Sequence, residues 1–309
     1  MKTAVALIIF NRPDTATKVF EIIRQLQPPM LLVIADAPRP HCPDDFHKCT
    51  ACKKIIEQVD WNCKVLTNYS EENLGPKIRI ATGLNWVFQQ VEAAIILEHD
   101  CLPHPTFFRF CEELLDKYRH DQRIMTISGN NFQFGKQRTE NSYYFSRYPL
   151  IWGWATWRRA WQEYDLEMKH WVEVRDGNWL QDILDDSTAV KYWMRIFQSY
   201  YQGNIETWDF PWTFASWLQN GLTILPNINL VSNIGFSPEA ANTKDIYSPF
   251  ANHPTQAVEF PLKHPNFIVR NAKADQFTQQ TQFHISLISK IKSKVKKILY
   301  SNFQLFAKN

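Results

Sequence analysis

The chain has 309 residues, of which 45% are hydrophobic and 21% are charged, a composition typical of globular proteins and not of disordered ones. Its net charge of +3 is unevenly distributed: nine basic residues and one acid follow from Pro261 onward (+8), so the first 260 residues carry −5. This acidic balance argues against nucleic acid as a partner of the main body.

The first 130 residues alternate short apolar runs with amphipathic segments. The first run, Ala4–Phe10, is short for the core of a signal peptide and no small-x-small cleavage site follows it, so we interpret it as a strand. No apolar run reaches the roughly 18 residues that span a bilayer, and we expect a cytoplasmic protein. The predicted strands are Ala4–Phe10, Leu31–Asp36, Lys64–Asn68, Ala94–Glu98 and Ile124–Ser128.

Helix-like segments lie between these strands. PDTATKVFEIIRQL (13–26) begins with a proline, which suits the first turn of a helix, and gathers its apolar residues on one side. GPKIRIATGLNWVFQQV (75–91) and PTFFRFCEELLDKY (105–118) repeat that pattern. The alternation predicts an α/β fold, a doubly wound, mostly parallel sheet with helices on both faces.

Polar residues follow three of the strands, in FNR (10–12), ADAPRP (35–40) and EHD (98–100). Such sheets bind ligands at the carboxyl ends of their strands. Glu98 and Asp100 are two residues apart and point the same way in an extended chain. A hard cation such as Mn²⁺ or Mg²⁺ takes one or two such carboxylates together with substrate phosphates. The alternative is a polar strand end that only serves solubility.

Further candidates for binding a nucleotide lie at the other strand ends. An aspartate such as Asp36 can accept a hydrogen bond from a pyrimidine N–H, and an arginine such as Arg12 can contact ribose or phosphate. In NLGPKIR (73–79), Lys77 and Arg79 stand at a helix start, where amides and cations suit an anionic diphosphate. A solvated helix face accounts for these two residues equally well.

The six cysteines agree with a reducing compartment. In HCPDDFHKCTAC (41–52), Cys42, Cys49 and Cys52 lie near two histidines, which leaves a zinc site open. No second CxxC completes a four-ligand pattern, and the start of a surface helix after Pro43 is the alternative.

The second half of the chain differs from the first in its high content of tryptophan. Ten of the twelve tryptophans fall between Trp152 and Trp217, a region whose pattern predicts helices, and LTILPNINLVSN (222–233) predicts two short strands around Pro226. We expect a single domain over residues 1–260, with a nucleotide-binding half (1–130) and an aromatic-rich acceptor half (131–260).

A basic tail occupies residues 261–309. ISLISKIKSKVKKILY (285–300) places apolar residues at helical spacing and fills the remainder with lysines. Over 286–300 this predicts an amphipathic helix lying on an anionic membrane surface, at the inner face of the membrane. A helix that packs its apolar stripe on the domain, or a frayed end, is the alternative.

The order of several motifs resembles a known family. GPKIRIATGLNWVFQQVEAAIILEHDCLPHPTFFRFCEELL (75–115) is similar to the corresponding stretch of GT-A-fold glycosyltransferases related to N-acetylglucosaminyltransferase I. The likeness continues through ISGNN (127–131), GWATWRRAW (153–161) and WDFPWTFASWLQNGLTILPNINLVSNIGF (208–236), and it covers roughly residues 4 to 236. The resemblance leads us to expect relatives among the bacterial proteins of this group.

The resemblance implies roles for individual residues. Asp100 matches the aspartate that ligates Mn²⁺, and Glu98 matches the acid that helps to orient the nucleotide. Asp36 resembles the residue that reads uracil, and Asp209 in TWDFPW matches the catalytic base. His99 departs from the family, which usually has aspartate there, and this puts the nucleotide contacts in doubt. From the residues alone, Asp209 would equally suit a helix N-cap.

The implied activity is the metal-dependent, inverting transfer of a hexosyl or N-acetylhexosaminyl group from a nucleotide-diphosphate donor, a UDP-sugar, to a glycan or other hydroxyl acceptor. Trp152, Trp154 and Trp157 could line the acceptor site by stacking on sugars, or could pack the core. The alternative function is a non-catalytic carbohydrate- or nucleotide-binding protein on the same fold. A nucleotidyltransferase is less consistent, because FNRPD (10–14) replaces a glycine-rich phosphate loop.

Overall fold

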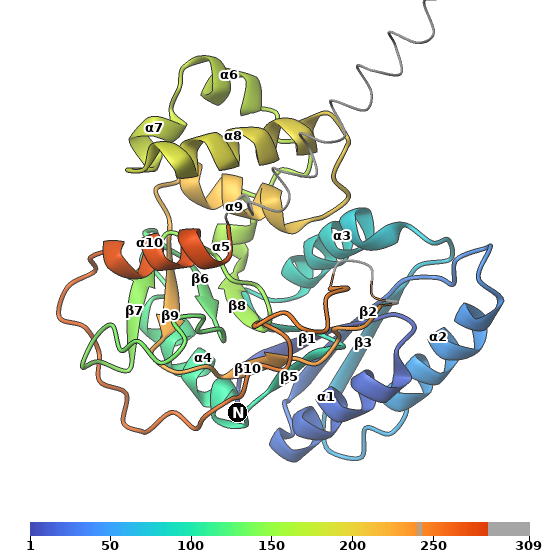
Figure 1. The fold of residues 1–309 in the computed structure, drawn as a ribbon. Helices are drawn as coiled ribbons and strands as arrows, with labels where there is room; N and C mark the ends of the chain where they lie inside the picture. The colour runs from blue at the N-terminus through green and yellow to red at the C-terminus, as the bar shows by residue number, and fades with distance from the viewer. Residues whose placement is uncertain (239, 241–242, 284–309) are drawn as a thin grey trace, which may run out of the picture.

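The computed structural model describes residues 1–238, 240 and 243–283 (Figure 1). An eight-stranded sheet has the order β3-β2-β1-β4-β8-β6-β9-β7, and β10 and β5 form a separate pair. The strands are β1 Ala4–Ile9, β2 Met30–Ala35, β3 Lys64–Tyr69, β4 Ala93–Glu98, β5 Cys101–Pro103, β6 Ile124–Ser128, β7 Tyr143–Ser146, β8 Trp154–Trp157, β9 Leu222–Pro226 and β10 Val231–Asn233. The helices are α1 Pro13–Leu26, α2 Pro43–Ile56, α3 Gly75–Gln90, α4 Thr106–Lys117, α5 Arg158–Trp161, α6 Trp171–Asp176, α7 Leu180–Ile183, α8 Ser187–Tyr201, α9 Asp209–Leu218 and α10 Ala272–Thr281.

The predicted α/β class is confirmed, as a mixed and mostly parallel sheet with helices on both faces. β1, β2, β3 and β4 run parallel, as do β6 and β9, whereas β8 is antiparallel to β4 and β6, and β7 is antiparallel to β9. Alternate residues of β1 point to opposite faces. Val5 and Leu7 pack with α1 and α4, and Ala6 and Ile8 pack with α3. Figure 1 shows α1 and α2 on one side of the sheet and α3 on the other.

Proline and glycine set the ends of the first helices. α1 begins at Pro13 and ends at Gln27, whose left-handed φ of 48° lets its amide donate to the Ile23 carbonyl at 3.0 Å. α3 begins at Gly75, which has a φ of 71° and is followed by a proline. These signals are local, and the predicted helix boundaries were therefore close to the observed ones.

The second half corrects one prediction. GWATWRRAW was expected to be helical, but Trp154–Trp157 form β8, which lies between β4 and β6, and helix α5 starts only at Arg158. All four residues of β8 are buried. A strand that is covered on both faces shows no alternation of polar and apolar residues, and so its sequence resembles a buried helix. The two short strands predicted around Pro226 are confirmed as β9 and β10.

The start of the basic tail belongs to the folded body. The amide of Asn271 donates to the Phe145 carbonyl of β7 at 2.8 Å. Asp275 of α10 accepts hydrogen bonds from Ser146 Oγ at 2.5 Å and from the Arg147 amide at 3.2 Å. These contacts join Asn271 and Asp275 to the body of the fold, and the predicted division at residue 260 stays a prediction. The predicted membrane helix over 286–300 lies outside the described residues, so its role stays a prediction.

The structure also bears on the possible zinc site and on membrane-spanning helices. Cys49 and Cys52 are buried on α2, where burial raises the pKa of their thiols to about 11 and about 12, which disfavours the thiolate that zinc needs. Within the described residues no three potential ligands group to hold a metal, so the zinc alternative at Cys42, Cys49 and Cys52 is not supported. None of the described helices combines the length and the apolar character that a membrane crossing requires.

Candidate active site

The strand order reverses between β1 and β4, because the chain first adds β2 and β3 on one side of β1 and then adds β4 on the other. Ligands bind at such a switch point, outside the carboxyl ends of the strands. A cavity of about 660 Å³ lies there. Its polar lining residues are Asn11, Arg12, Asp36, Arg39, Asn73, Arg79, Glu98, His99, Asp100, Glu206, Thr207, Asp209, Asn233 and Thr243.

Three carboxylates from separate parts of the chain face this cavity. Glu98 ends β4, Asp100 stands in the turn that follows, and Asp209 occupies the first turn of α9. Burial raises the pKa of Glu98, and the charges of Asp100 and Asp209 raise it further. The ion pairs of the described chain include none of these three side chains. None of the three is therefore neutralised by an ion pair within the described protein, although Arg12, Arg39 and Arg79 line the same cavity.

Asp100 is positioned by the segment that follows β10. The amide of Ile234 donates to the Asp100 carbonyl at 2.8 Å. A Cβ atom on Gly235 would lie only 2.0 Å from Asp100 Oδ2, so no side chain fits at that position. Arg12 donates to the Gly235 carbonyl at 2.7 Å and to the Ser237 hydroxyl. Arg12 thus holds this segment against Asp100, in addition to lining the cavity.

Asp209 does not act as the side-chain cap of α9, because the N-cap residue is Trp208 and no side-chain cap bond forms there. Its carboxylate instead accepts a hydrogen bond from the Thr207 hydroxyl. Burial raises the pKa of Asp209, an effect that this hydrogen bond reduces. The carboxylate is therefore a stronger base than a solvated aspartate.

Asp36 and Arg79 line the cavity, but both side chains form hydrogen bonds with backbone groups of the protein. Asp36 is 7% exposed and accepts hydrogen bonds from the amides of Leu74 at 3.0 Å and Gly75 at 2.9 Å, at the start of α3. Arg79 is 4% exposed and donates to the Ala35 carbonyl at 3.1 Å. The contacts of these residues with uracil and with a diphosphate stay predictions, and they would compete with these internal hydrogen bonds.

His99 lies beside the carboxylates. Its amide donates to the Ile8 carbonyl at 2.8 Å, which extends the pairing of β1 and β4 by one residue. Burial lowers the pKa of His99, although the charge of Asp100 opposes this, and the lowered pKa favours the neutral ring. Its buried Nδ1 atom has no hydrogen-bond partner among the described residues. A buried polar atom of this kind is rare and is available to a ligand.

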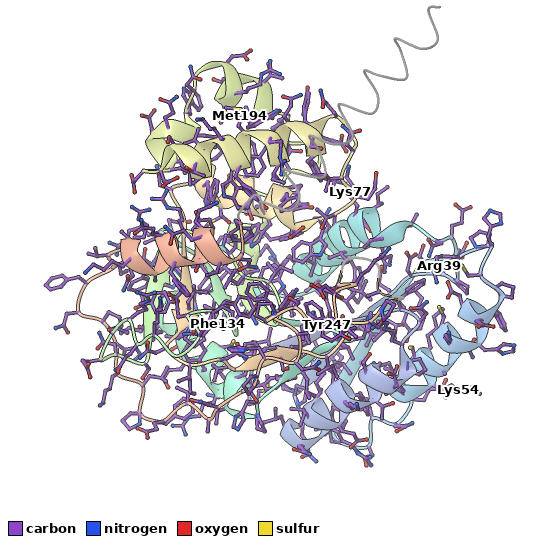
Figure 2. The ribbon with its side chains drawn as sticks, in the orientation of Figure 1. Arg39, Lys54, Lys77, Phe134, Met194 and Tyr247 are labelled. Carbon is purple, nitrogen blue, oxygen red and sulfur yellow. The ribbon has the colours of Figure 1, made fainter. Side chains whose placement is uncertain are left out.

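Three predicted site residues do not line this cavity, and the roles predicted for them stay predictions. The Lys77 ammonium lies 4.4 Å from the centre of the Tyr200 ring on α8 and does not line the cavity; Figure 2 labels Lys77 near that helix. Trp154 is buried among other rings, and Trp157 is buried with Nε1 bonded to the Leu115 carbonyl at 3.1 Å. Of the three tryptophans, Trp152 alone lines the cavity.

The sequence patterns missed several lining residues. Asn11, Asn73 and Thr207 carry no motif of their own, although each adjoins a predicted strand end, helix start or catalytic pair. Asn233 accepts a hydrogen bond from the Gly235 amide at 2.9 Å and so shapes the turn that reaches Asp100. Only long-range folding brings this turn to the end of β4.

The residues that could hold a cation are Asp100 and Glu98. They do not form a complete protein cage, since the described chain groups no three candidate ligands. Mg²⁺ and similar cations commonly use one or two carboxylates and complete their shell with substrate phosphates and water. Carboxylates that form no ion pair with the described protein, at a switch-point cavity, fit a cation of that kind.

Neither a protein-family model nor a curated protein matches the sequence. Solved structures with a similar fold include a UDP-glucose pyrophosphorylase in complex with UDP-glucose, at 13% identity and a TM-score of 0.27, covering 47% of this chain and 62% of that one. The chain thus spans less than two thirds of that enzyme. The 4-diphosphocytidyl-2C-methyl-D-erythritol synthase of Anaerococcus prevotii matches at 9% identity, with a TM-score of 0.33 and coverage of 53% and 76%.

Mouse xyloside xylosyltransferase 1, in its apo form, is 11% identical, with a TM-score of 0.36, and the match covers 69% of this chain and 80% of the mouse protein. These proteins include nucleotidyltransferases and a glycosyltransferase. At such identities and TM-scores the likeness carries no conclusion about the reaction of this chain.

Proposed function

We propose that this protein transfers a sugar from a nucleotide-diphosphate donor to a hydroxyl acceptor with the help of a divalent cation. The observation that supports the proposal is the convergence of Glu98, Asp100 and Asp209 on one cavity, where none of the three forms an ion pair with a described residue. A diphosphate and a cation would meet such a site with complementary chemistry. The resemblance of the motifs to GT-A glycosyltransferases favours UDP as the nucleotide.

The chain's own residues divide the work. Asp209 would take the proton of the acceptor hydroxyl as that oxygen attacks the anomeric carbon, and Thr207 holds the carboxylate in place. Asp100, supported by Glu98, would hold Mn²⁺ or Mg²⁺, which would neutralise the charge that develops on the departing diphosphate. A base and a leaving group on opposite sides of the sugar give inversion.

The donor's nucleotide would lie toward β1 and β2, where Arg12, Asp36 and His99 line the cavity. The unpaired Nδ1 of His99 could accept a hydrogen bond from a hydroxyl of the donor. Trp152, on another side of the cavity, would contact the acceptor.

The experiment measures turnover of UDP-glucose, UDP-N-acetylglucosamine and UDP-galactose with Mn²⁺ or with a chelator. We expect cation-dependent release of UDP that Asp100→Ala abolishes. Asp209→Asn should slow transfer by about 10² to 10⁴-fold, the usual contribution of a general base. Asp116→Asn, an exposed aspartate on α4, is the matched control and should retain wild-type rates.

Cation-dependent binding without turnover across the donors and a broad acceptor panel would contradict the proposal. That result would instead support the alternative, a protein that binds nucleotide sugars or carbohydrates without reacting them. Turnover that persists in Asp209→Asn at the wild-type rate would leave the cation site intact but remove Asp209 from catalysis.

A further inference from the structure

A row of aromatic rings leads from the candidate active site across the second half of the molecule. Trp152, in the cavity lining, lies 5.5 Å from the ring of Phe132, which lies 5.0 Å from that of Phe250. Phe250 is 5.6 Å from Phe134, and Phe134 is 6.4 Å from Phe277 on α10. We call these five rings, together with His253 beside Phe134, the aromatic strip.

Phe134 is the most unusual member of the strip. Its φ of 49° is left-handed, a conformation that is unfavourable for a bulky side chain, and Gly135 follows with a φ of 81°. The side chain is nevertheless 38% exposed, so burial in a core does not account for its place (Figure 2). Strained residues of this kind concentrate at sites that bind ligands.

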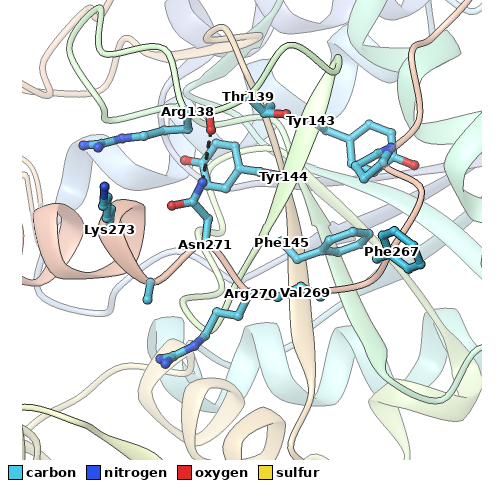
Figure 3. A pocket seen from close by; sticks show the side chains of 12 residues that line it. Arg138, Thr139, Tyr143, Tyr144, Phe145, Phe267, Val269, Arg270, Asn271 and Lys273 are labelled. Carbon is cyan, nitrogen blue, oxygen red and sulfur yellow. Dashed lines mark hydrogen bonds between the residues drawn. The ribbon is translucent and has the colours of Figure 1, made fainter.

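Basic side chains lie at the far end of the strip. The Lys136 ammonium is 4.0 Å from the centre of the Phe277 ring, and the Arg138 guanidinium carbon is 5.3 Å from it. Arg138 and Lys273 also line a cavity of about 350 Å³ at the start of α10, where Figure 3 shows Asn271 beside them. None of these three cations is ion-paired to an acid of the described chain.

This combination distinguishes carbohydrate from lipid. A lipid tail needs a continuous apolar surface, whereas the strip presents the exposed Phe134 with the half-buried Phe250, His253 and Phe277 and ends among cations. Phe132, which joins these rings to Trp152, is buried and serves as their support. The faces of sugar rings carry C–H groups that pack on aromatic rings while their hydroxyls stay available for hydrogen bonds. Cations next to such rings match carboxylate or phosphate substituents.

We propose that the aromatic strip binds an acidic oligosaccharide, which is the extended part of the acceptor whose terminal hydroxyl reaches Trp152. This inference rests on the proposed glycosyl transfer for the identity of the acceptor. The strip itself is a separate binding site, because its members beyond Trp152 do not line the cavity that holds the carboxylates. Length and negative charge of the acceptor are thus the properties that the protein selects.

The test is calorimetric binding of galacturonic acid and its oligomers, from the dimer to the hexamer, to the full chain. Affinity should rise with length, by about twofold to tenfold for each added stacking contact if these contribute as aromatic pairs do. Phe134→Gly removes the ring and suits the left-handed backbone, so it should abolish this rise without lowering the melting temperature. Lys136→Gln with Arg138→Gln should weaken binding of the acidic hexamer but leave binding of chitohexaose, a neutral hexamer, unchanged.

Phe46→Ala on α2, where the side chain is 64% exposed, is the matched control and should bind like the wild type. Affinity that does not depend on length, or an unchanged Phe134→Gly variant, would overturn the proposal. So would Phe134-dependent binding of phosphatidylglycerol vesicles in place of the oligomers. Release of UDP from a donor without acceptor should be equal in wild type and Phe134→Gly, so that a failure of the transferase proposal is visible separately from a failure of the strip.

Discussion

The two halves of the molecule are stabilised in different ways. In the first half, aliphatic strands form the sheet, and polar side chains at the strand ends bind backbone groups, as Asp36 binds the start of α3. In the second half, rings pack on rings: Trp212 lies 5.7 Å from Trp154 and 5.3 Å from Trp161. Aromatic side chains bury large areas and prefer tilted or offset contacts of this kind.

The cavity lies where the aliphatic sheet of the first half meets the aromatic core of the second half. Glu98 and Asp100 at the end of β4 bring carboxylates to it from the first half, and the second half brings Trp152, before β8, together with Asp209 of α9. The two ligands differ in a similar way to these two parts of the cavity lining. A nucleotide diphosphate carries charge, whereas a sugar carries C–H faces and hydroxyls. The contrast between the halves therefore suggests which wall meets which part of the ligands, and the variants below perturb one wall at a time.

Replacing Trp212 should have the largest effect on stability. The side chain is fully buried and its Nε1 donates to Thr126 Oγ1 at 3.1 Å. Trp212→Ala leaves a large void among rings and should reduce the free energy of unfolding by about 3–5 kcal/mol. Urea unfolding followed by circular dichroism measures this. As the first-half control, Ile96→Val on β4 should cost only about 0.5–1.5 kcal/mol; equal costs would remove the distinction between the two halves.

Gly235→Ala should act on the charged wall. The added Cβ would meet Asp100 Oδ2 at 2.0 Å, so the carboxylate or the segment after β10 must move. A displacement of about 1 Å in a catalytic group can cost about 100-fold in rate, and we expect a loss of that order in cation-dependent release of UDP. The control is Gly135→Ala, where no atom lies within 4 Å of the added Cβ and only the left-handed backbone is strained. Its melting temperature should fall while its rate stays normal.

Sequence patterns predicted the first half well because its signals are local. Apolar runs gave the strands, and Pro13 and Gly75 marked helix starts that the structure confirms. The same reasoning failed for β8, since Trp154 is placed by pairing with Ile96 of β4, far away in the chain. Glu98 and Asp100 were predicted from their strand end and Asp209 from the resemblance of TWDFPW to a known family, whereas the contact between Asp100 and Gly235 depends on a fold that no local pattern shows.

Asp36→Ala should separate a structural role from a nucleotide-binding one. The change leaves the amides of Leu74 and Gly75 without their buried acceptor, which should cost about 1–3 kcal/mol of unfolding free energy. Asp36→Asn keeps one acceptor oxygen and should cost less. Chemical unfolding measures both variants, and titration with UDP reports on binding. If Asp36→Asn keeps its stability but loses affinity for UDP and not for CDP, the carboxylate also reads the base.

Lys77→Gln should have the smallest effect, and it tests the link between the halves. The ammonium lies over the Tyr200 ring at 4.4 Å, a contact worth about 0.5–1 kcal/mol when partly exposed. Lys53→Gln is the matched variant within the first half, since Lys53 lies over the Tyr69 ring at 4.7 Å. Both should lower the unfolding free energy by similar amounts and leave the KM for the donor unchanged. A KM raised about tenfold by Lys77→Gln alone would show that this ammonium leaves Tyr200 to contact the diphosphate, and the boundary between the two walls would then include α3.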